Sequence, residues 1–573
     1  MFKLISQYIK GTAVACAVFA PVFMFLEVFM DLQQPTLMAD IVNNGVANAD
    51  MHYVLATGLR MIICSLLGLL GGVGCCFLAC FTAVSVSGHL RTSLFAKIQT
   101  LSFTELDELK TASLITRMTN DVVQLQHMVM MLLRGMIRSP LLCIGGIFMS
   151  FRLSPRLAVI FCVVLPILIA CTVLVLTKTI PLYTKMQGQI DSVNTVMREN
   201  LLGVRVVKAF TMERKQLGRF SEVNAGLVDI SIRAQSATFL LMPIVTLVMN
   251  ISVVAILWLG GNMEVAGTVE AGTIMAFVNY MMQITNSLVM LVNLFLSFSR
   301  AQASAKRITE VFAKESSVSE PEKPLEPQGF DIEFKDVSFR YGTGAFVLKN
   351  ISLTLKQGQR VGIIGTTGCG KSTLVSLIPR LYDTTHGSVS IGGVDVRNIS
   401  FSVLRESVGV VLQESLLFSG SIGDNLRFGD SGASDDELFR AAEISQAREF
   451  IGDLNSRVEQ RAKNFSGGQK QRLSITRTLL KKPKILILDD SASAVDLDTE
   501  AKMQAGIREG MTGSTIILIA QRISTVMDCD TILVLDQSGR LAAEGRHSEL
   551  MQSCELYRSI AVSQLGEEAV ICA

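Results

Sequence analysis

The residues with the clearest chemical purpose are a run of glycines followed by a lysine and hydroxyl side chains. The run follows the spacing G-x-x-x-x-G-K-[ST], which is typical of a phosphate-binding loop. Backbone N–H groups of such a loop surround the β- and γ-phosphates, the lysine adds positive charge, and the serine hydroxyl reaches Mg²⁺. The sequence therefore predicts a nucleotide site that contains Gly365, Thr366, Thr367, Gly368, Cys369, Gly370, Lys371, Ser372 and Thr373.

The segments on either side of this loop fit the elements that must position it. Residues Arg360–Ile364 form an apolar run that predicts a strand, and Ser372–Ile378 predicts a helix. The N-terminus of that helix would add its dipole to the anion site. The strand–loop–helix context makes the motif a specific indication of nucleotide binding.

A second group of motifs follows further along the chain. Asn464–Gln469 reads Asn-Phe-Ser-Gly-Gly-Gln, and the apolar run Ile485–Leu488 leads directly into Asp489 and Asp490. In this order, the motifs resemble those of the ABC-transporter ATPase family. The resemblance identifies the family's signature motif, which would contact a partner's ATP, with Ser466, Gly467, Gly468 and Gln469.

The resemblance also implies roles for residues around the phosphate loop. Tyr341 would stack on adenine, and Gln413 would reach Mg²⁺ and the attacking water. Asp489 would bind Mg²⁺ together with Ser372 and Gln413, and Ser493–Asp496 would form the D-loop, which includes Asp496. The cofactors implied are ATP and Mg²⁺.

Two catalytic positions depart from the family pattern. Asp490 stands where the family has the glutamate that activates water, and its carboxylate is set back by roughly 1 Å, a displacement that can cost about 100-fold in rate. Gln521 stands where the family has its switch histidine, and an amide cannot become a cation. Neutral drift that leaves a weak base is one interpretation, and a degenerate site that binds ATP but cleaves it slowly is the other, which two substitutions favour.

The family's ATPase domains bind two nucleotides between two subunits, each nucleotide between one phosphate loop and the other subunit's signature motif. The intact signature of this chain would then complete a competent site on a second half-transporter. The prediction is a heterodimer in which ATP hydrolysis occurs mainly at that composite site. A homodimer with two slow sites is the alternative.

The first half of the chain has a different composition. Apolar residues make up 49% and charged residues 18% of the 573 residues, and the apolar residues concentrate before residue 300. Six segments are long enough to cross a bilayer, namely Gly11–Gln33, Tyr53–Ser87, His127–Ser150, Leu157–Thr177, Ala237–Trp258 and Ile274–Phe298. The predicted fold is an all-α membrane domain over residues 1–312, a linker over 313–328 and an α/β nucleotide-binding domain of ABC type over 329–573.

Lysine and arginine predict the orientation in a cytoplasmic membrane. Pro35–Leu59 and Gly260–Gly272 contain neither, whereas the long stretches His89–Arg138 and Lys178–Arg233 are basic. The positive-inside rule therefore places the N-terminus, the basic stretches and the nucleotide-binding domain in the cytoplasm. Arg152 and Arg156 go against this trend, and we expect them to snorkel at the membrane interface.

The two long basic connections also resemble the intracellular loops of ABC exporters. Thr111–Asp121 resembles the first loop and Glu199–Phe210 the second. The resemblance implies short coupling helices, the second of which docks on the partner's ATPase domain. Periodicity alone is equally consistent with amphipathic helices that have solvated faces.

The substrate is indicated only by two acidic residues in the first span. Glu27 and Asp31 are four residues apart and share a helical face. Glu27 either helps to bind a cationic amphiphile, or the two residues have a structural role, paired with an arginine of another helix or placed near the outer interface. The predicted function is ATP-driven export of hydrophobic or small amphipathic compounds, as in multidrug exporters; a lipid or peptide exporter and an ATP-gated channel or regulator are the alternatives. A net charge of +2 gives no indication of nucleic-acid binding.

Overall fold

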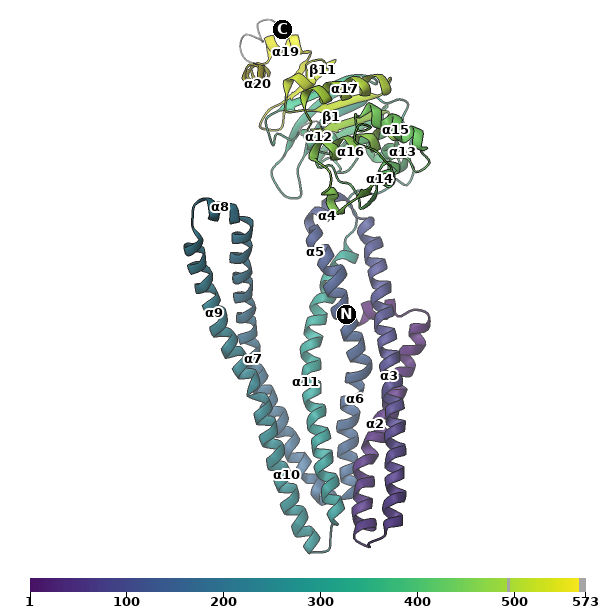
Figure 1. The fold of residues 1–573 in the computed structure, drawn as a ribbon, viewed down its shortest axis with the longest axis vertical. Coiled ribbons are helices and arrows are strands. Elements are labelled where there is room, and N and C mark those ends of the chain that lie inside the picture. Colours follow the sequence, from purple (N-terminus) through teal and green to yellow (C-terminus); the bar gives the residue numbers. More distant parts are fainter. Residues whose placement is uncertain (492–494, 566–573) are drawn as a thin grey trace. The chain divides into compact units, whose positions relative to one another are not determined.

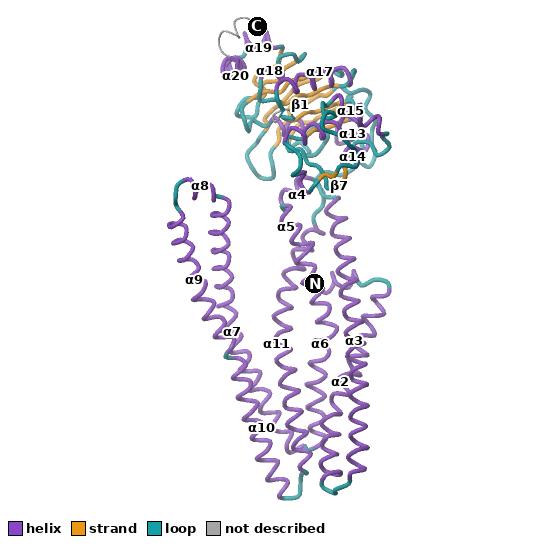
Figure 2. The backbone as a smooth tube through the Cα atoms, viewed as in Figure 1, coloured by secondary structure: helices purple, strands orange, loops and turns teal. Residues whose placement is uncertain are grey.

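The computed structural model describes residues 1–491 and 495–565 and divides into two compact units (Figure 1). The first unit contains residues 1–97 and 112–313, and the second contains residues 98–111 and 314–573. Strands occur only in the second unit among the described residues (Figure 2). The structure therefore confirms an all-α membrane domain followed by an α/β domain.

The first unit is built from long helices that the apolar segments of the sequence produce. Six of its helical stretches are long and apolar enough to cross a membrane, which confirms the six predicted spans. A bilayer needs about 20 residues per helix, so stretches such as Met51–Gln99 continue well beyond it. The helices are α1 (Phe2–Tyr8), α2 (Thr12–Asp40), η1 (Ile41–Val46), α3 (Met51–Gln99), α5 (Thr111–Thr116), η2 (Arg117–Asp121), α6 (Val122–Leu153), α7 (Pro155–Leu202), α8 (Val204–Ala209), α9 (Glu213–Phe239), α10 (Leu241–Val265) and α11 (Ala271–Ala313).

The core of this unit lies where α2, α6 and α11 pack together. Tyr280 of α11 is fully buried there, and its hydroxyl donates a hydrogen bond to the Leu32 carbonyl at 2.7 Å. On the other side of the unit, α7 and α9 run side by side and α8 joins them at the tip (Figure 1). This hairpin carries the predicted second coupling segment, Glu199–Phe210.

A close approach of α2 and α3 sets the position of Glu27. A Cβ atom at Gly71 would lie 2.9 Å from the Glu27 backbone nitrogen, and one at Gly72 would lie 3.1 Å from its carboxyl carbon. Only glycine leaves room for this contact between the helices. The glycines of α3 therefore place an acidic side chain at a helix interface.

The second unit is centred on a six-stranded sheet with the order β12-β11-β3-β10-β9-β6. All neighbouring strands pair in parallel except β12 with β11. Strands β9 and β10 are buried along their whole length, which is expected for a parallel sheet covered on both faces. The elements of the sheet and its helices are α4 (Phe103–Leu109), β3 (Arg360–Gly365), α12 (Lys371–Ser376), η3 (Val396–Asn398), α13 (Phe401–Ser407), β6 (Val408–Val411), α14 (Ile422–Arg427), α15 (Asp435–Ile444), η4 (Gln460–Ala462), α16 (Gly467–Leu480), β9 (Ile485–Asp489), α17 (Leu497–Gly510), β10 (Thr515–Ile519), α18 (Ile523–Val526), β11 (Thr531–Leu535), β12 (Leu541–Gly545), α19 (His547–Ser553) and α20 (Glu555–Leu565).

Two smaller sheets complete this unit. Strands β1 (Ile332–Phe339), β2 (Leu348–Leu355), β4 (His386–Ile391) and β5 (Val394–Asp395) form an antiparallel sheet with the order β2-β1-β4-β5. Strands β7 (Gly420–Ser421) and β8 (Arg457–Val458) form a short pair. The antiparallel sheet places Tyr341 two residues after the end of β1.

The helix after the phosphate loop is shorter than the sequence predicts. We expected it over Ser372–Ile378, but α12 spans Lys371–Ser376 and continues only as turns. The residue before a proline disfavours helical backbone, and Pro379 follows Ile378 directly. The predicted strand Arg360–Ile364 is confirmed as β3, one residue longer.

Candidate nucleotide-binding site

Most of the predicted nucleotide residues line one cavity of about 420 Å³. Apart from Tyr341, which follows β1, they lie at or just after the ends of four neighbouring parallel strands, β3, β10, β9 and β6. In such sheets, ligands bind at the carboxyl ends of the strands. The predicted residues on its wall are Tyr341, Thr367, Gly368, Gly370, Lys371, Ser372, Thr373, Gln413, Asp489, Asp490 and Gln521.

The phosphate loop is held by glycine backbone and by its own lysine. Gly368 and Gly370 have φ angles of +83° and +96°, which other residues rarely adopt. The Lys371 Nζ donates hydrogen bonds to the carbonyls of Gly365 at 2.8 Å and Thr366 at 3.0 Å. Cys369 faces inward and is buried, and this burial raises the pKa of its thiol.

The predicted magnesium ligands lie next to each other. The Ser372 hydroxyl donates to the Asp489 carboxylate at 3.0 Å, and Asp489 is only 5% exposed. A carboxylate and a hydroxyl are hard oxygen donors, which fits Mg²⁺. Burial of Asp489 raises its pKa above the ordinary value, and the negative charge of Asp490 adds to this effect.

The raised pKa of Asp489 predicts how magnesium binding depends on pH. In the predicted role of Asp489, protons would compete with Mg²⁺ for this carboxylate, so acidification should weaken Mg²⁺-dependent ATP binding at a higher pH than for an ordinary aspartate. Titration of fluorescent ATP analogues with Mg²⁺ at successive pH values would measure this loss. Binding without Mg²⁺ provides the control, and an identical pH dependence in both series would contradict the prediction.

Two amide side chains bind the carboxylate at the predicted base position. Gln521 Nε2 donates to the Asp490 Oδ2 at 2.8 Å, and Gln413 Nε2 donates to the same oxygen at 3.2 Å. The backbone of Asp490 has a φ of +44°, a region that aspartate tolerates better than most residues. The oxygen that would accept a proton from water therefore already accepts two amide hydrogens.

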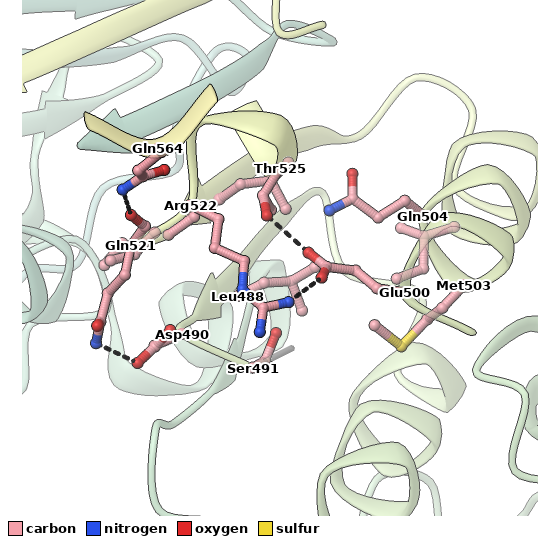
Figure 3. Close-up of a pocket in the computed structure, with 14 residues that line it drawn as sticks. Leu488, Asp490, Ser491, Glu500, Met503, Gln504, Gln521, Arg522, Thr525 and Gln564 are labelled. Carbon is pink, nitrogen blue, oxygen red and sulfur yellow. Dashed lines mark hydrogen bonds and ion pairs between the residues drawn. The ribbon is translucent and has the colours of Figure 1, made fainter. Parts of the chain in front are cut away.

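The C-terminal helix fixes the segment that carries Gln521 (Figure 3). The side-chain Nε2 of Gln564 in α20 donates to the Gln521 backbone carbonyl at 2.7 Å, and its side-chain Oε1 accepts from the Ile523 N–H at 2.8 Å. A second cavity of about 340 Å³ shares Asp490 and Gln521 with the nucleotide cavity. Sequence reasoning missed Gln564, because no local pattern indicates a contact across 43 residues.

The predicted adenine-stacking residue belongs to an aromatic cluster. The Tyr341 ring packs edge-on against Tyr382 with centroids 5.3 Å apart, and its hydroxyl is 3.0 Å from the Thr373 hydroxyl. The Tyr382 hydroxyl donates to the Asp107 carboxylate at 2.8 Å, and its ring contacts Phe103. Tyr382 therefore connects the adenine side of the cavity to helix α4.

Helix α4 was not among the predicted coupling segments. It precedes the predicted loop Thr111–Asp121 and begins with a capping box, in which the Ser102 N–H donates to Glu105 at 3.2 Å. Burial favours protonation of Glu105, but hydrogen bonds from Ser102 and Ser317 outweigh it and lower its pKa. The pattern Ser-x-x-Glu in the sequence was the signal that could have located this helix.

We expect the hydrogen bond from Tyr382 to Asp107 to stabilise the position of α4 beside the cavity. Tyr382→Phe keeps the ring beside Tyr341 but removes a hydrogen bond to a charged group, which stabilises by about 2 kcal/mol. We expect faster amide exchange over residues 103–109 and unchanged ATP affinity. Asp107→Ala combined with Tyr382→Phe should add little to either change alone, because both remove the same contact; additive effects would contradict the assignment.

The signature motif is separate from this cavity. Ser466 is the N-cap of α16, where its N–H donates to Gln469 Oε1 at 2.9 Å and its hydroxyl accepts from the Gln469 N–H at 3.3 Å. Ser466 and Gly467 are exposed, which the predicted contact with another subunit requires. Asp496 caps α17 by accepting from the Thr499 N–H at 2.9 Å, whereas Ser493 and Ala494 of the predicted D-loop lie outside the described residues.

The acidic residues of the first span have an arginine partner. Arg138 of α6 lies 2.9 Å from Asp31 and 3.4 Å from Glu27. This is the pairing with another helix that the sequence left open as an alternative to substrate binding. Glu27 nevertheless keeps one buried carboxylate oxygen without a hydrogen-bond partner, and one arginine neutralises only one of the two carboxylates.

Comparison with known proteins identifies the family of this two-part chain. The model of the ABC transporter transmembrane region matches residues 18–288, and the ABC transporter model matches residues 348–493. The uncharacterized ABC transporter ATP-binding protein YfiB of Bacillus subtilis is 39% identical over 554 residues, 96% of each chain. The chain belongs to the ABC transporter family. It is an exporter-type half-transporter that joins one membrane domain to one ATPase domain.

Further relatives agree with this assignment. The half-transporter is 37% identical over 542 residues to the uncharacterized ABC transporter ATP-binding protein MT1311 of Mycobacterium tuberculosis, covering 93% of each chain. Its fold matches the structure of a bacterial Atm1-family ABC exporter with ATP bound, with a TM-score of 0.81, 24% identity and coverage of 96% of this chain and 99% of the other. A half-transporter of this kind binds ATP and requires a second subunit.

Proposed function

We propose that this half-transporter is the degenerate-site subunit of a heterodimeric exporter of hydrophobic or amphipathic compounds. The observation that carries the proposal is the cluster in which Gln521 and Gln413 both donate to Asp490. A water molecule attacking the γ-phosphate must lose a proton to a base in reach. The carboxylate at the base position belongs to Asp490, which is one methylene shorter than glutamate. The switch position holds Gln521, whose amide cannot become a cation.

Most of the residues predicted to bind ATP, in contrast, follow the family pattern and line one cavity. The carboxyl ends of β3 and β9 bring together Lys371, Ser372 and Asp489. The Tyr341 side chain lines the same cavity and is 44% exposed. We assign ATP and Mg²⁺ to this cavity, with the roles that the sequence predicts for each residue. The chain's own site would then hold nucleotide for long periods and keep the two ATPase domains associated.

The signature motif would serve the second subunit. Ser466 and Gly467 are exposed at the N-terminus of α16, a 14-residue helix whose dipole favours a phosphate. A partner with glutamate and histidine at its two catalytic positions would complete a fast site against this surface. Hydrolysis at that composite site would drive the transport cycle.

The tip of the α7–α9 hairpin supports assembly with a second subunit. Helix α8 and its neighbours expose a set of apolar side chains that a solvated helix would not retain, with Leu202 82% and Phe210 69% exposed. We assign this tip, as the second coupling helix, to a groove on the partner's ATPase domain. The basic residues of the same hairpin favour the cytoplasmic side of the cytoplasmic membrane for it, for the N-terminus and for the ATPase domain.

ATP turnover of the purified chain tests the heterodimer. Alone and reconstituted in lipid, it should hydrolyse ATP far more slowly than the complex with its partner. Co-purification with a six-span ABC subunit that carries glutamate and histidine at the two substituted positions would identify that partner. Turnover of the isolated chain at the rate of the complex would refute the proposal and favour a homodimer.

The excess carboxylate beside Arg138 supports a substrate that carries positive charge. Glu27→Gln should reduce transport of a cationic dye by about tenfold or more and leave a neutral dye of similar size within about twofold, because only the cation needs the buried charge. Dye efflux from inverted vesicles measures both. Equal loss for the two dyes would show that Glu27 only holds α2 against α6.

A lipid substrate is the second candidate. The ATP-dependent lipid A-core flippase of Syntrophus aciditrophicus is 31% identical to this chain over 496 residues, 86% of this chain and 82% of that protein. ATP-dependent movement of a fluorescent lipid in proteoliposomes, with no efflux of either dye, would favour this candidate.

A further inference from the structure

An apolar groove of about 510 Å³ runs along the surface of the membrane domain between α7 and α10. These two helices pack against each other over their membrane-spanning parts. Apart from Arg156 and Ser252, the walls of the groove are aliphatic side chains, among them Val159, Val163, Ile167, Val248, Ile251 and Ala255. The Ser252 hydroxyl donates to the Val248 carbonyl of its own helix at 2.6 Å. Such walls exclude a polar ligand along most of the length.

One end of the groove carries a positive charge. Arg156 lines the groove and lies in the first turn of α7, directly after Pro155. It is exposed, and the structure gives it no ion pair or hydrogen bond among the residues it describes. An unpaired guanidinium at the end of a membrane span, with a helix N-terminus beside it, favours an anion.

The length of the groove matches one leaflet of a bilayer. From Arg156 to Ile167 the α7 wall contains 11 helical steps, which correspond to about 16 Å at 1.5 Å per residue. The hydrocarbon core of a bilayer is about 30 Å thick, so one leaflet contributes about half of that. The groove therefore has the length of a single lipid, with a charge at the membrane interface and an apolar wall that ends near the membrane midplane.

We propose that this groove binds one anionic phospholipid, with an acyl chain between α7 and α10 and the phosphate on Arg156. Arginine presents a planar fork of donors that fits phosphate oxygens. In the orientation proposed above, this lipid belongs to the outer leaflet, which also explains why an arginine is kept there against the positive-inside trend. The proposal depends only on the membrane location of the chain and stands apart from the heterodimer and its substrate.

Native mass spectrometry of the assembled transporter tests this site. Phosphatidylglycerol and phosphatidylcholine with identical chains are added to the delipidated complex, and lipid adducts on this subunit are counted. Arg156→Gln should lower phosphatidylglycerol retention about fivefold, since one basic residue near the surface contributes about a factor of that size. Arg152→Gln is the matched control, because Arg152 is exposed near the same helix ends but does not line the groove.

A second pair of variants tests the groove itself. Ala255→Phe fills the groove and should reduce retention of both lipids, whereas Val254→Phe adds the same ring at a side chain that is 64% exposed and outside the groove. Equal retention of the two lipids by the unmodified complex, or equal losses for Arg152→Gln and Arg156→Gln, would overturn the proposal. Loss of subunit assembly in Ala255→Phe with unchanged lipid retention would also overturn it and assign the groove to the partner subunit.

Discussion

Replacing Asp490 by glutamate and Gln521 by histidine together should raise ATP cleavage at the chain's own site by about 100-fold. Glutamate extends the carboxylate by one methylene toward the γ-phosphate. Histidine removes the amide that now donates to Asp490 Oδ2 at 2.8 Å, and it adds a ring that can carry positive charge. Each single change restores only one of these functions, so the double variant should exceed the product of the two.

ATP cleavage at the chain's own site must be measured separately from cleavage at the proposed faster site on the partner's phosphate loop. The base glutamate of the partner is replaced by glutamine, and single-turnover cleavage of radiolabelled ATP is followed with the complex in excess. Asp490→Asn is the matched control and keeps the shape of the side chain. In a complex whose partner keeps its base glutamate, it should change overall turnover by less than about threefold, because the proposal gives Asp490 little role as a base. A large loss in that control would show that Asp490 already catalyses cleavage.

The backbone at position 490 sets a condition for this gain. Its φ of +44° and the hydrogen bond from its N–H to the Ile519 carbonyl at 3.0 Å hold the residue in a left-handed conformation. Glutamate pays more than aspartate to adopt this region, by about 1 kcal/mol. This cost corresponds to about a fivefold loss, so the gain should remain well above tenfold. No gain in the double variant would contradict the proposal that the two substitutions limit cleavage at this site.

The parts of the site that the sequence predicted are those that local pattern controls. The sequence predicted the strands that became β3 and β9, and parallel strands end at one edge of a sheet, so the phosphate loop and Asp489 had to meet. Gln413 and Gln521, which follow β6 and β10, were predicted from the family resemblance instead. Gln413, Asp489 and Gln521 are all found at that edge. The six spans were equally predictable, because length and hydropathy alone decide which helices can cross a bilayer.

The features that the sequence did not predict depend on contacts between distant segments. Gln564 reaches back to the segment around Gln521, Tyr382 contacts Asp107, and Arg138 pairs with two residues of α2. The sequence shows that each of these residues can form hydrogen bonds or ion pairs. Periodicity, however, indicates only which face of its own helix a residue occupies. Which helix lies opposite follows from packing of the whole domain, and a single sequence does not contain that information in local form.

The proposed division of labour between the two sites predicts an unusual order of mutational effects. Ser466→Ala should lower overall ATP turnover of the complex by at least about tenfold, because in the proposed arrangement it removes a hydroxyl from the site that cleaves ATP. Lys371→Met should weaken nucleotide binding at the chain's own site and change overall turnover by only a few-fold. In a transporter with two equal sites, the lysine substitution would be the more damaging of the two.

Loss of a helix cap must be separated from loss of catalysis in this comparison. Ser466 caps α16 through a capping box with Gln469, and its removal costs about 1 kcal/mol of stability. Ser434 caps α15 through the same kind of box with Glu437, is exposed as well, and lies outside the nucleotide cavity. Ser434→Ala should therefore match the stability loss of Ser466→Ala but keep turnover. If both serine variants lost turnover alike, or if Lys371→Met were the slower enzyme, Ser466 would not belong to the productive site.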